Sequence, residues 1–181
     1  GEPGRFDAGS VITNGTPVIL KNEMRFYYGG YRGTAIGGIG LNEQKPGTAD
    51  YHSGIGMVST PRDRFVALAI NSDCPVKAQK PGKPKITNTI GQVTLKAQDI
   101  TGISTITINA NATDGSAWVE ILNEDGFRLH GFTKEEATPL KGDSLAFAAR
   151  WKEKELADLP PGNYLIRVHL LQAELYAVSL K

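Results

Sequence analysis

The sequence predicts an all-β protein whose larger part is an antiparallel β-sandwich of jelly-roll-like type. Apolar and polar residues alternate with a period of two through most of the chain, which is typical of strands with one buried face. The 21 glycines and 10 prolines supply the many turns that such folds need. Residues 1–70 show no helical periodicity, and about seven short strands follow in the second half.

The segment Ser116–Phe132 is predicted to be a β-hairpin at the middle of the sandwich. Ala117, Val119 and Ile121 alternate with Trp118, Glu120 and Leu122. Asn123-Glu124-Asp125-Gly126 then supplies turn formers, with Gly126 placed for a positive φ. Phe127 and Leu129 resume the apolar face, while Arg128 and His130 point the other way.

The first part of the chain is predicted to consist of short strands and hairpins. Val11–Ile12 and Pro17–Leu20 are apolar runs separated by the turn Asn14-Gly15. In Met24–Gly30, Met24, Phe26 and Tyr28 are expected on one side, and Arg25 and Tyr27 on the other. We expect a second hairpin from Gly54–Thr60 and Arg64–Ile70, with Phe65–Ile70 apolar enough to be buried on both faces.

A segment rich in proline and lysine, Pro75–Lys85, indicates a linker between two units. The predicted division is 1–74 for the first unit, 75–88 for the linker and 89–181 for the sandwich. The strands expected in the sandwich, besides the hairpin, are Gln92–Lys96, Ile103–Ala112, Leu145–Trp151, Tyr164–Leu170 and Glu174–Leu180.

Composition excludes several classes of function. Twenty basic and nineteen acidic residues give a net charge of +1, which does not indicate a nucleic-acid partner. No apolar run reaches the roughly 18 residues of a membrane span. Cys74 is the only cysteine, so neither an intrachain disulfide nor a cysteine-rich zinc site is possible.

No catalytic, metal or cofactor motif stands out. His52, His130 and His169 are scattered, and the strand pattern predicts that His130 and His169 are surface residues, so we expect no metal site and no cofactor. There is no Gly-x-Ser-x-Gly and no phosphate loop. Glycoside hydrolysis needs two carboxylates that face each other across a sugar. Among the acids of the first seventy residues, Asp7 is the candidate to line a pocket, because it lies between Phe6 and the first apolar run.

Some aromatic side chains are candidates for stacking on sugar rings. Trp151 shares its predicted strand face with Leu145 and Phe147, which favours core packing. Trp118 is out of phase with Val119 and Ile121, so it lies either at a domain interface or on a sugar platform. Arg25 and Tyr27 share the less apolar face of their strand and are predicted to line a cleft.

Three segments carry a resemblance to a known family. Glu23–Tyr31 (EMRFYYGGY), Gly38–Leu41 (GIGL) and Arg62–Leu68 (RDRFVAL) resemble the last part of the five-bladed β-propellers of glycoside hydrolase families 32, 43 and relatives, in bacterial branches with "YYGG" and "GIGLA" strands. The residues after the linker are similar to the sandwich appended to those propellers. Gly115–Gly126 matches its "G-x-v-x-V-E-i-l-D-x-x-G" pattern, with Asn123 in place of the aspartate.

This resemblance implies a partial β-propeller-like segment followed by the sandwich, and therefore the C-terminal part of a glycoside hydrolase that acts on carbohydrate. A five-bladed propeller needs roughly 200 to 250 residues, and the family's catalytic acids come from blades that this chain lacks. No catalytic residue is therefore carried over. The first unit would be about one blade, whose exposed strand edges need a partner, by self-association or from an upstream propeller. The resemblance also implies an extracellular or periplasmic location.

Three functions follow as hypotheses. The first is a structural or accessory role of the sandwich in such an enzyme, with no catalysis by this chain alone. The second is a non-catalytic carbohydrate-binding protein that uses Tyr27, Tyr31 and Trp118, with Asp7 and Arg25 as polar partners. The third is a structural or adhesive β-sandwich.

Overall fold

The computed structural model describes residues 1–2, 5–31, 53–70 and 90–181. The chain divides into two compact units, Gly1–Asp63 and Arg64–Lys181. Residues 64–70 therefore belong with the second unit, whereas the predicted division at residue 74 placed them with the first. The predicted linker, Cys74 and His52 lie outside the described residues.

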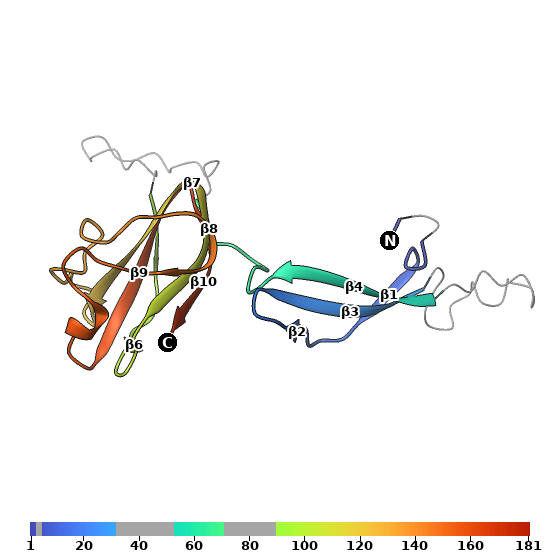
Figure 1. The fold of residues 1–181 in the computed structure, drawn as a ribbon, viewed down its shortest axis with the longest axis horizontal. Helices are drawn as coiled ribbons and strands as arrows, with labels where there is room; N and C mark the ends of the chain where they lie inside the picture. Colours follow the sequence, from blue (N-terminus) through green and yellow to red (C-terminus); the bar gives the residue numbers. More distant parts are fainter. Residues whose placement is uncertain (3–4, 32–52, 71–89) are drawn as a thin grey trace, which may run out of the picture. The chain divides into compact units, whose positions relative to one another are not determined.

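The first unit is one antiparallel sheet built around a long central strand (Figure 1). Strand β3 pairs along its whole length with β4, from Glu23 opposite Pro61 to Tyr31 opposite Ser53. On its other side β3 pairs with β1 near Tyr31 and with β2 near Met24, so two short strands share that edge. The strands are β1 (Ser10–Thr13), β2 (Val18–Ile19), β3 (Glu23–Tyr31) and β4 (Ser53–Pro61).

Both faces of this sheet carry exposed apolar side chains. Directly opposite residues of an antiparallel pair lie on the same face, so the register assigns each side chain. The Tyr27 face comprises Ile12, Val18, Arg25, Tyr27, Tyr31, Ile55 and Met57. The Met24 face comprises Val11, Ile19, Met24, Phe26, Tyr28 and Val58. The predicted alternation of β3 is thus confirmed, and Met24 is its buried member, at 3% exposed.

The predicted hairpin between Gly54–Thr60 and Arg64–Ile70 is wrong. Strand β4 pairs with β3 instead, and Leu68 forms an isolated antiparallel bridge with Leu175 of the second unit, through two backbone hydrogen bonds of 2.8 and 2.9 Å. Phe65 and Val66 are 60% and 75% exposed, so this apolar run is not buried on both faces. Its apolar composition was misleading because one backbone bridge, not side-chain burial, anchors it.

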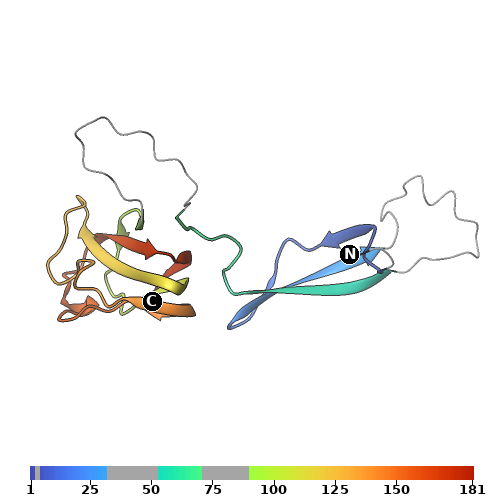
Figure 2. The ribbon, with the colours of Figure 1, turned by 90° about the horizontal axis from the view of Figure 1, so that it is seen from above.

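The second unit is a single six-stranded antiparallel sheet that curls on itself. Strand β7 is its organising element, because its first half lies between β10 and β8 and its second half pairs with β9. Figure 2 shows this long, bent strand in yellow. The strands are β5 (Gly91–Thr94), β6 (Gln98–Asp99), β7 (Ile106–Asn123), β8 (Leu140–Ala148), β9 (Asn163–Leu171) and β10 (Glu174–Leu180), with a 3-10 helix η2 (Leu156–Asp158). The prediction of an all-β, sandwich-like fold is confirmed.

Strand β7 replaces two predicted strands and bends where they were separated. Its pairing with β8 shifts register between Ala112 and Ala117. Gly115 lies at this bend, where a Cβ would overlap the carbonyl of Leu171, so only glycine allows the close approach. The bend changes which parity faces inward, so Ile108 of the first half and Val119 of the second both enter the core.

The predicted hairpin Ser116–Phe132 is correct in its first strand and turn only. Gly126 has φ 87°, its N–H donates to the Asn123 carbonyl at 3.0 Å, and the Phe127 N–H donates to Asn123 Oδ1 at 2.7 Å. After the turn, an isolated bridge joins Arg128 to Leu122, and Phe127 is 69% exposed. The second arm is a loop that stays bonded to β7, because the Asn123 N–H donates to the Phe127 carbonyl at 3.0 Å and the Ile121 N–H donates to the Phe132 carbonyl at 3.1 Å.

The core of the second unit contains the residues that the strand pattern predicts. They include Ile106, Ile108, Ala110, Ala117, Val119, Ile121, Ile166, Val168 and Leu170, each 2% exposed or less. Trp151 is 8% exposed, packs edge-on against Phe132 with ring centroids 5.2 Å apart, and donates from Nε1 to the Val119 carbonyl at 3.0 Å. Its predicted role in core packing is confirmed.

Candidate functional site

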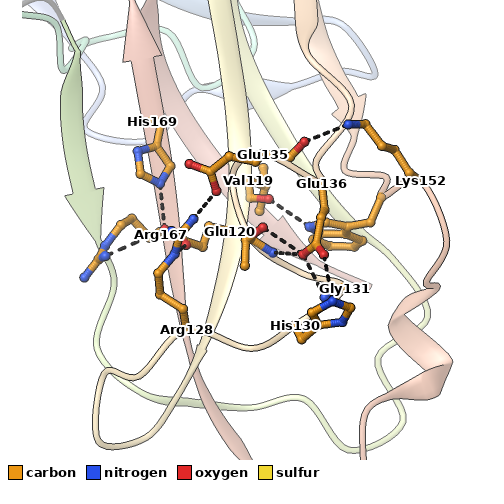
Figure 3. A network of polar contacts seen from close by, with 12 residues as sticks. Val119, Glu120, Arg128, His130, Gly131, Glu135, Glu136, Lys152, Arg167 and His169 are labelled. Atoms are coloured by element: carbon orange, nitrogen blue, oxygen red, sulfur yellow. Dashed lines mark hydrogen bonds and ion pairs between the residues drawn. The ribbon is translucent and has the colours of Figure 1, made fainter.

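The most concentrated polar chemistry in the described residues lies on the outer face of β7 and β9. Glu120 stands between the core residues Val119 and Ile121 and therefore points away from the core, towards Arg167 and His169 of β9. The loop after β7 adds Arg128 and Glu135. We call these five residues the Glu120 cluster (Figure 3): Glu120, Arg128, Glu135, Arg167 and His169.

Glu120 is the centre of this cluster and is only 1% exposed. Its Oε2 lies 2.7 Å from His169 Nε2 and 3.7 Å from the guanidinium of Arg167. Its Oε1 accepts a hydrogen bond of 2.6 Å from Arg128 Nε, and Arg128 also pairs with Glu135. Both carboxylate oxygens are thus occupied, as a buried carboxylate requires.

The protonation states follow from this geometry. Burial raises the pKa of Glu120, but the hydrogen bonds and charges of His169 and Arg128 outweigh burial, so the pKa lies below its ordinary value. Burial lowers the pKa of His169, and the bond to Glu120 offsets only part of that effect. At neutral pH the charged Glu120 carboxylate therefore accepts a hydrogen bond from the Nε2–H of a neutral His169 imidazole.

The other imidazole nitrogen has no partner. His169 Nδ1 is buried and receives no hydrogen bond from any described residue. In the neutral tautomer with the proton on Nε2, this nitrogen is an acceptor. An acceptor left unpaired in the interior is unfavourable, so the Glu120 bond must hold the ring in place against that penalty.

The cluster closes the outer face and leaves no room for a substrate. A carboxylate-imidazole pair activates a nucleophile only where a hydroxyl or thiol lies within hydrogen-bond reach and a substrate can enter. Glu120 and His169 are 1% and 4% exposed, and among the described residues their side-chain hydrogen bonds join them to each other and to Arg128. The arrangement instead fastens the Arg128 loop to the sheet.

A cavity of 210 Å³ lies elsewhere in the second unit, between the start of β7 and η2. Its lining includes Ser104, Arg150, Trp151 and Lys154. Ligand sites are usually about 300 to 1,000 Å³ and largely apolar, so this cavity is smaller than a typical ligand pocket.

The predicted site residues lie in three separate places. Arg25, Tyr27 and Tyr31 share the Tyr27 face of β3, with Tyr27 and Tyr31 43% and 37% exposed. Arg25 is committed to Glu23 through a 2.7 Å hydrogen bond. Four residues of a strand span roughly 13 Å, so a single sugar ring cannot stack on both tyrosines.

Asp7 lies with the opposite face of that sheet. It accepts a hydrogen bond of 2.8 Å from the Tyr28 hydroxyl, and Phe6 stacks on the Tyr28 ring at 6.2 Å between centroids. The Tyr28 hydrogen bond holds the pKa of Asp7 below its ordinary value. Its side chain is 15% exposed, so Asp7 acts mainly as the partner of Tyr28.

Trp118 belongs to the second unit and is half-buried on the face that carries the Glu120 cluster. It lies opposite His169 in the strand register, and the Lys134 ammonium is 5.0 Å from its ring centroid. The ring thus has a cation over one face and the sheet beneath it. This packing leaves little of the ring for a sugar.

Sequence reasoning missed the Glu120 cluster and misplaced one of its members. His169, predicted to be a surface residue, is 4% exposed, whereas the prediction for His130 is confirmed by its 93% exposed side chain. The sequence did contain an indication of this cluster. Trp118 and Leu122 lie on the same strand face as Glu120, and a face with these two residues is too apolar to be solvated. This face of β7 therefore had to be covered by another segment, and the loop that carries Arg128 covers it.

The described ranges contain no group of three or more His, Cys, Asp or Glu side chains placed to hold a metal ion. In the same ranges, no helix has the length and apolarity needed to cross a membrane.

The chain was compared with protein-family models, with curated protein sequences and with solved structures, and none of the three comparisons gave a match.

Proposed function

We propose that this chain is the non-catalytic, C-terminal accessory region of a propeller-type glycoside hydrolase that acts on carbohydrate. In this proposal the first unit is a propeller blade, and the second unit is a sandwich that supports the propeller. The chemistry takes place elsewhere in the protein, in blades outside this chain.

One observation carries the proposal: the sheet of the first unit exposes apolar side chains on both faces. On the Tyr27 face Ile55 is 83% and Ile12 50% exposed, and on the Met24 face Ile19 is 60% and Val58 53% exposed. A soluble sheet normally buries one face against its own core. A propeller blade is instead packed between two neighbouring sheets, so both of its faces are apolar.

The second unit is consistent with a supporting role. Its Glu120 cluster is closed by Arg128 and Arg167. A second group of titratable side chains is also internally paired, because Arg64 binds Asp143 and lies over the Tyr176 ring. The core runs from Ile106 to Leu175 with few buried polar groups. A rigid, closed sandwich of this kind suits structural support.

The deciding experiment is the accurate mass of the product of the native gene, compared with the 19.5 kDa of this chain. We expect a product larger by several blades, and hydrolysis of aryl glycosides by that product but not by the 181-residue chain. A native product of 19.5 kDa, or hydrolysis by this chain alone, would overturn the proposal.

A second candidate function is carbohydrate binding without catalysis, favoured by the common placement of Arg25, Tyr27 and Tyr31 on one face. Exposed aromatic rings beside a charged donor suit the stacking and hydrogen bonding of a sugar chain. The test is a glycan array probed with the wild type and with Tyr27→Ala and Tyr31→Ala. Loss of binding in both variants, with retention in a Trp118→Ala control, supports this function, and no binding by the wild type rejects it.

A further inference from the structure

The free edge of β4 is unusual among the described strands because its protection against pairing is limited to Pro61 at its end. Its nine residues, Ser53–Pro61, contain no lysine, arginine, aspartate or glutamate. Proteins normally protect long strand edges with charges, interruptions or covering segments. Here, β4 pairs only with β3 within the described part of the chain.

The other edges show those protections. The opposite edge of the same sheet is interrupted between β1 and β2. In the second unit, Leu68 pairs with Leu175 on β10, and β8 carries Lys141 and Asp143. The contrast indicates that the β4 edge is kept open for a partner.

The register identifies which backbone groups of β4 face outward. The Arg62 N–H donates to the Asn22 carbonyl at 3.0 Å, one step beyond the Glu23–Pro61 pair. Hydrogen-bonded and non-hydrogen-bonded pairs alternate along an antiparallel ladder. Residues 54, 56, 58 and 60 therefore bond to β3, and the N–H and C=O groups of Ile55, Met57 and Ser59 point away from it.

The position of the proline at the end of β4 supports this assignment of the outward-facing backbone groups. Pro61 occupies an outward-facing position, where its missing N–H removes nothing from the β3 ladder. The same phase places the Ile55 and Met57 side chains, 83% and 47% exposed, on the Tyr27 face. An added strand would thus gain both backbone hydrogen bonds and apolar contacts.

We infer that two copies of this chain pair antiparallel through their β4 edges, with the two-fold axis at Met57. In this register Met57 faces Met57 of the second copy as a hydrogen-bonded pair, and Ile55 faces Ser59 on each side. The outward N–H and C=O groups of these residues then all find partners.

Two features of the edge favour a second copy as the occupant. In an isologous contact a residue at the two-fold axis faces its own equivalent, so a charge near the axis would meet a like charge, and β4 has no charged residue. The side chains also match: Met57 lies beside Tyr27 in each sheet, so pairing forms a continuous apolar row of Tyr27, Met57 and their two equivalents. The two sheets become one sheet of twice the width.

The test uses opposite charges at the two-fold axis. The wild-type chain is expected to sediment as a dimer in the micromolar range. Met57→Lys and Met57→Glu each place like charges opposite one another and are expected to be monomers. An equimolar mixture of the two variants pairs lysine with glutamate and is expected to restore the dimer.

A matched control is Val18→Lys, because Val18 is also 47% exposed and lies on the same face, but at the opposite edge of the sheet. This variant is expected to stay dimeric. Met57→Pro is a backbone test, since it removes an outward N–H without touching the β3 ladder, and it is expected to be a monomer that keeps its strand circular dichroism.

A monomeric wild type would overturn the inference. So would a mixture of the lysine and glutamate variants that fails to associate, because it would show that Met57 does not lie on the axis. The inference does not rest on the proposed function: sedimentation decides the one, and the mass of the native gene product decides the other.

Discussion

The two units use antiparallel strands in opposite ways. The second unit curls one sheet around a closed core, with Ile108, Ile121 and Ile166 at 0% exposed. The first unit leaves apolar side chains exposed on both faces of its sheet, and Met24 is the one buried apolar side chain of its described part. The second unit therefore buries its own apolar surface, whereas the first leaves much of its apolar surface exposed.

The largest expected effect comes from the core of the second unit. Ile166→Ala removes a fully buried side chain and should lower the free energy of unfolding by about 2–5 kcal/mol. Ile55→Ala in the first unit, at 83% exposed, should change it by less than about 0.5 kcal/mol. Both tryptophans, Trp118 and Trp151, lie in the second unit, so their fluorescence during urea unfolding measures Ile166→Ala, and the circular dichroism of the strands in both units measures Ile55→Ala. Equal effects of the two substitutions would contradict the comparison.

A smaller effect is expected at the outer face of the second unit. Glu120→Gln leaves Arg128 and Arg167 without their buried carboxylate and should cost about 1–3 kcal/mol. The control is Glu135→Gln, because Glu135 is 66% exposed and binds the same arginine, and it should cost less than about 0.5 kcal/mol. If the two variants unfolded at the same urea concentration, the cluster would not fasten the loop.

The next effect depends on pH. The pKa of His169 is lower in the folded chain than its ordinary value of 6.5, so below about pH 6.5 the unfolded chain binds a proton that the folded chain does not. Stability should therefore fall as the pH falls from that value. The pKa of Glu120 is also lowered, from 4.5, so a second loss should follow in more acidic solution.

His169→Gln should remove the first of these two losses, as measured by the melting temperature between pH 8 and pH 5. The control is His130→Gln, which changes the same residue type at a 93% exposed side chain. It should leave the wild-type profile intact. A wild-type melting temperature that stays constant from pH 7 to pH 5 would refute the assignment of a neutral, buried His169.

The smallest effect is expected within the first unit. Tyr28→Phe removes the hydroxyl that holds the pKa of Asp7 below 3.8, so the pKa of this carboxyl should rise towards that value. The shift can be followed by NMR titration of the Asp7 side chain. The stability of the second unit should not change, because this contact belongs to the first unit alone.

The sequence predicted those features of the fold that depend on the type of each residue alone, such as which face of a strand is buried and where a turn lies. The alternation of Ile106, Ile108 and Ala110, and of Ile166, Val168 and Leu170, predicted inward-facing strands, and all of these residues are buried. The turn at Asn123–Gly126 was predictable because its residue types have few other conformations. Which strands pair with each other could not be predicted in the same way, because many strands share the same alternation of apolar and polar residues.

The errors have a common cause. Phe65–Ile70 is as apolar as a buried strand, yet its partner is the backbone of Leu175, more than one hundred residues later in the chain. The Glu120 cluster was missed because Glu120 and His169 lie on different strands, and only the β7–β9 register brings them to 2.7 Å. The period of a strand identifies its faces, but not what covers them.

The pairing of β7 also determines the order in which the second unit can fold. Every strand that pairs with β7 follows it in the chain, and the pairing of its first residue, Ile106, with Leu180 is among the last contacts to become available during synthesis. Such non-local contacts require loop closure before they contribute stability, so folding in milliseconds to seconds is expected, not microseconds. Until β9 and β10 have left the ribosome, β7 can pair only with β8, and chaperones can bind its remaining apolar residues during that interval.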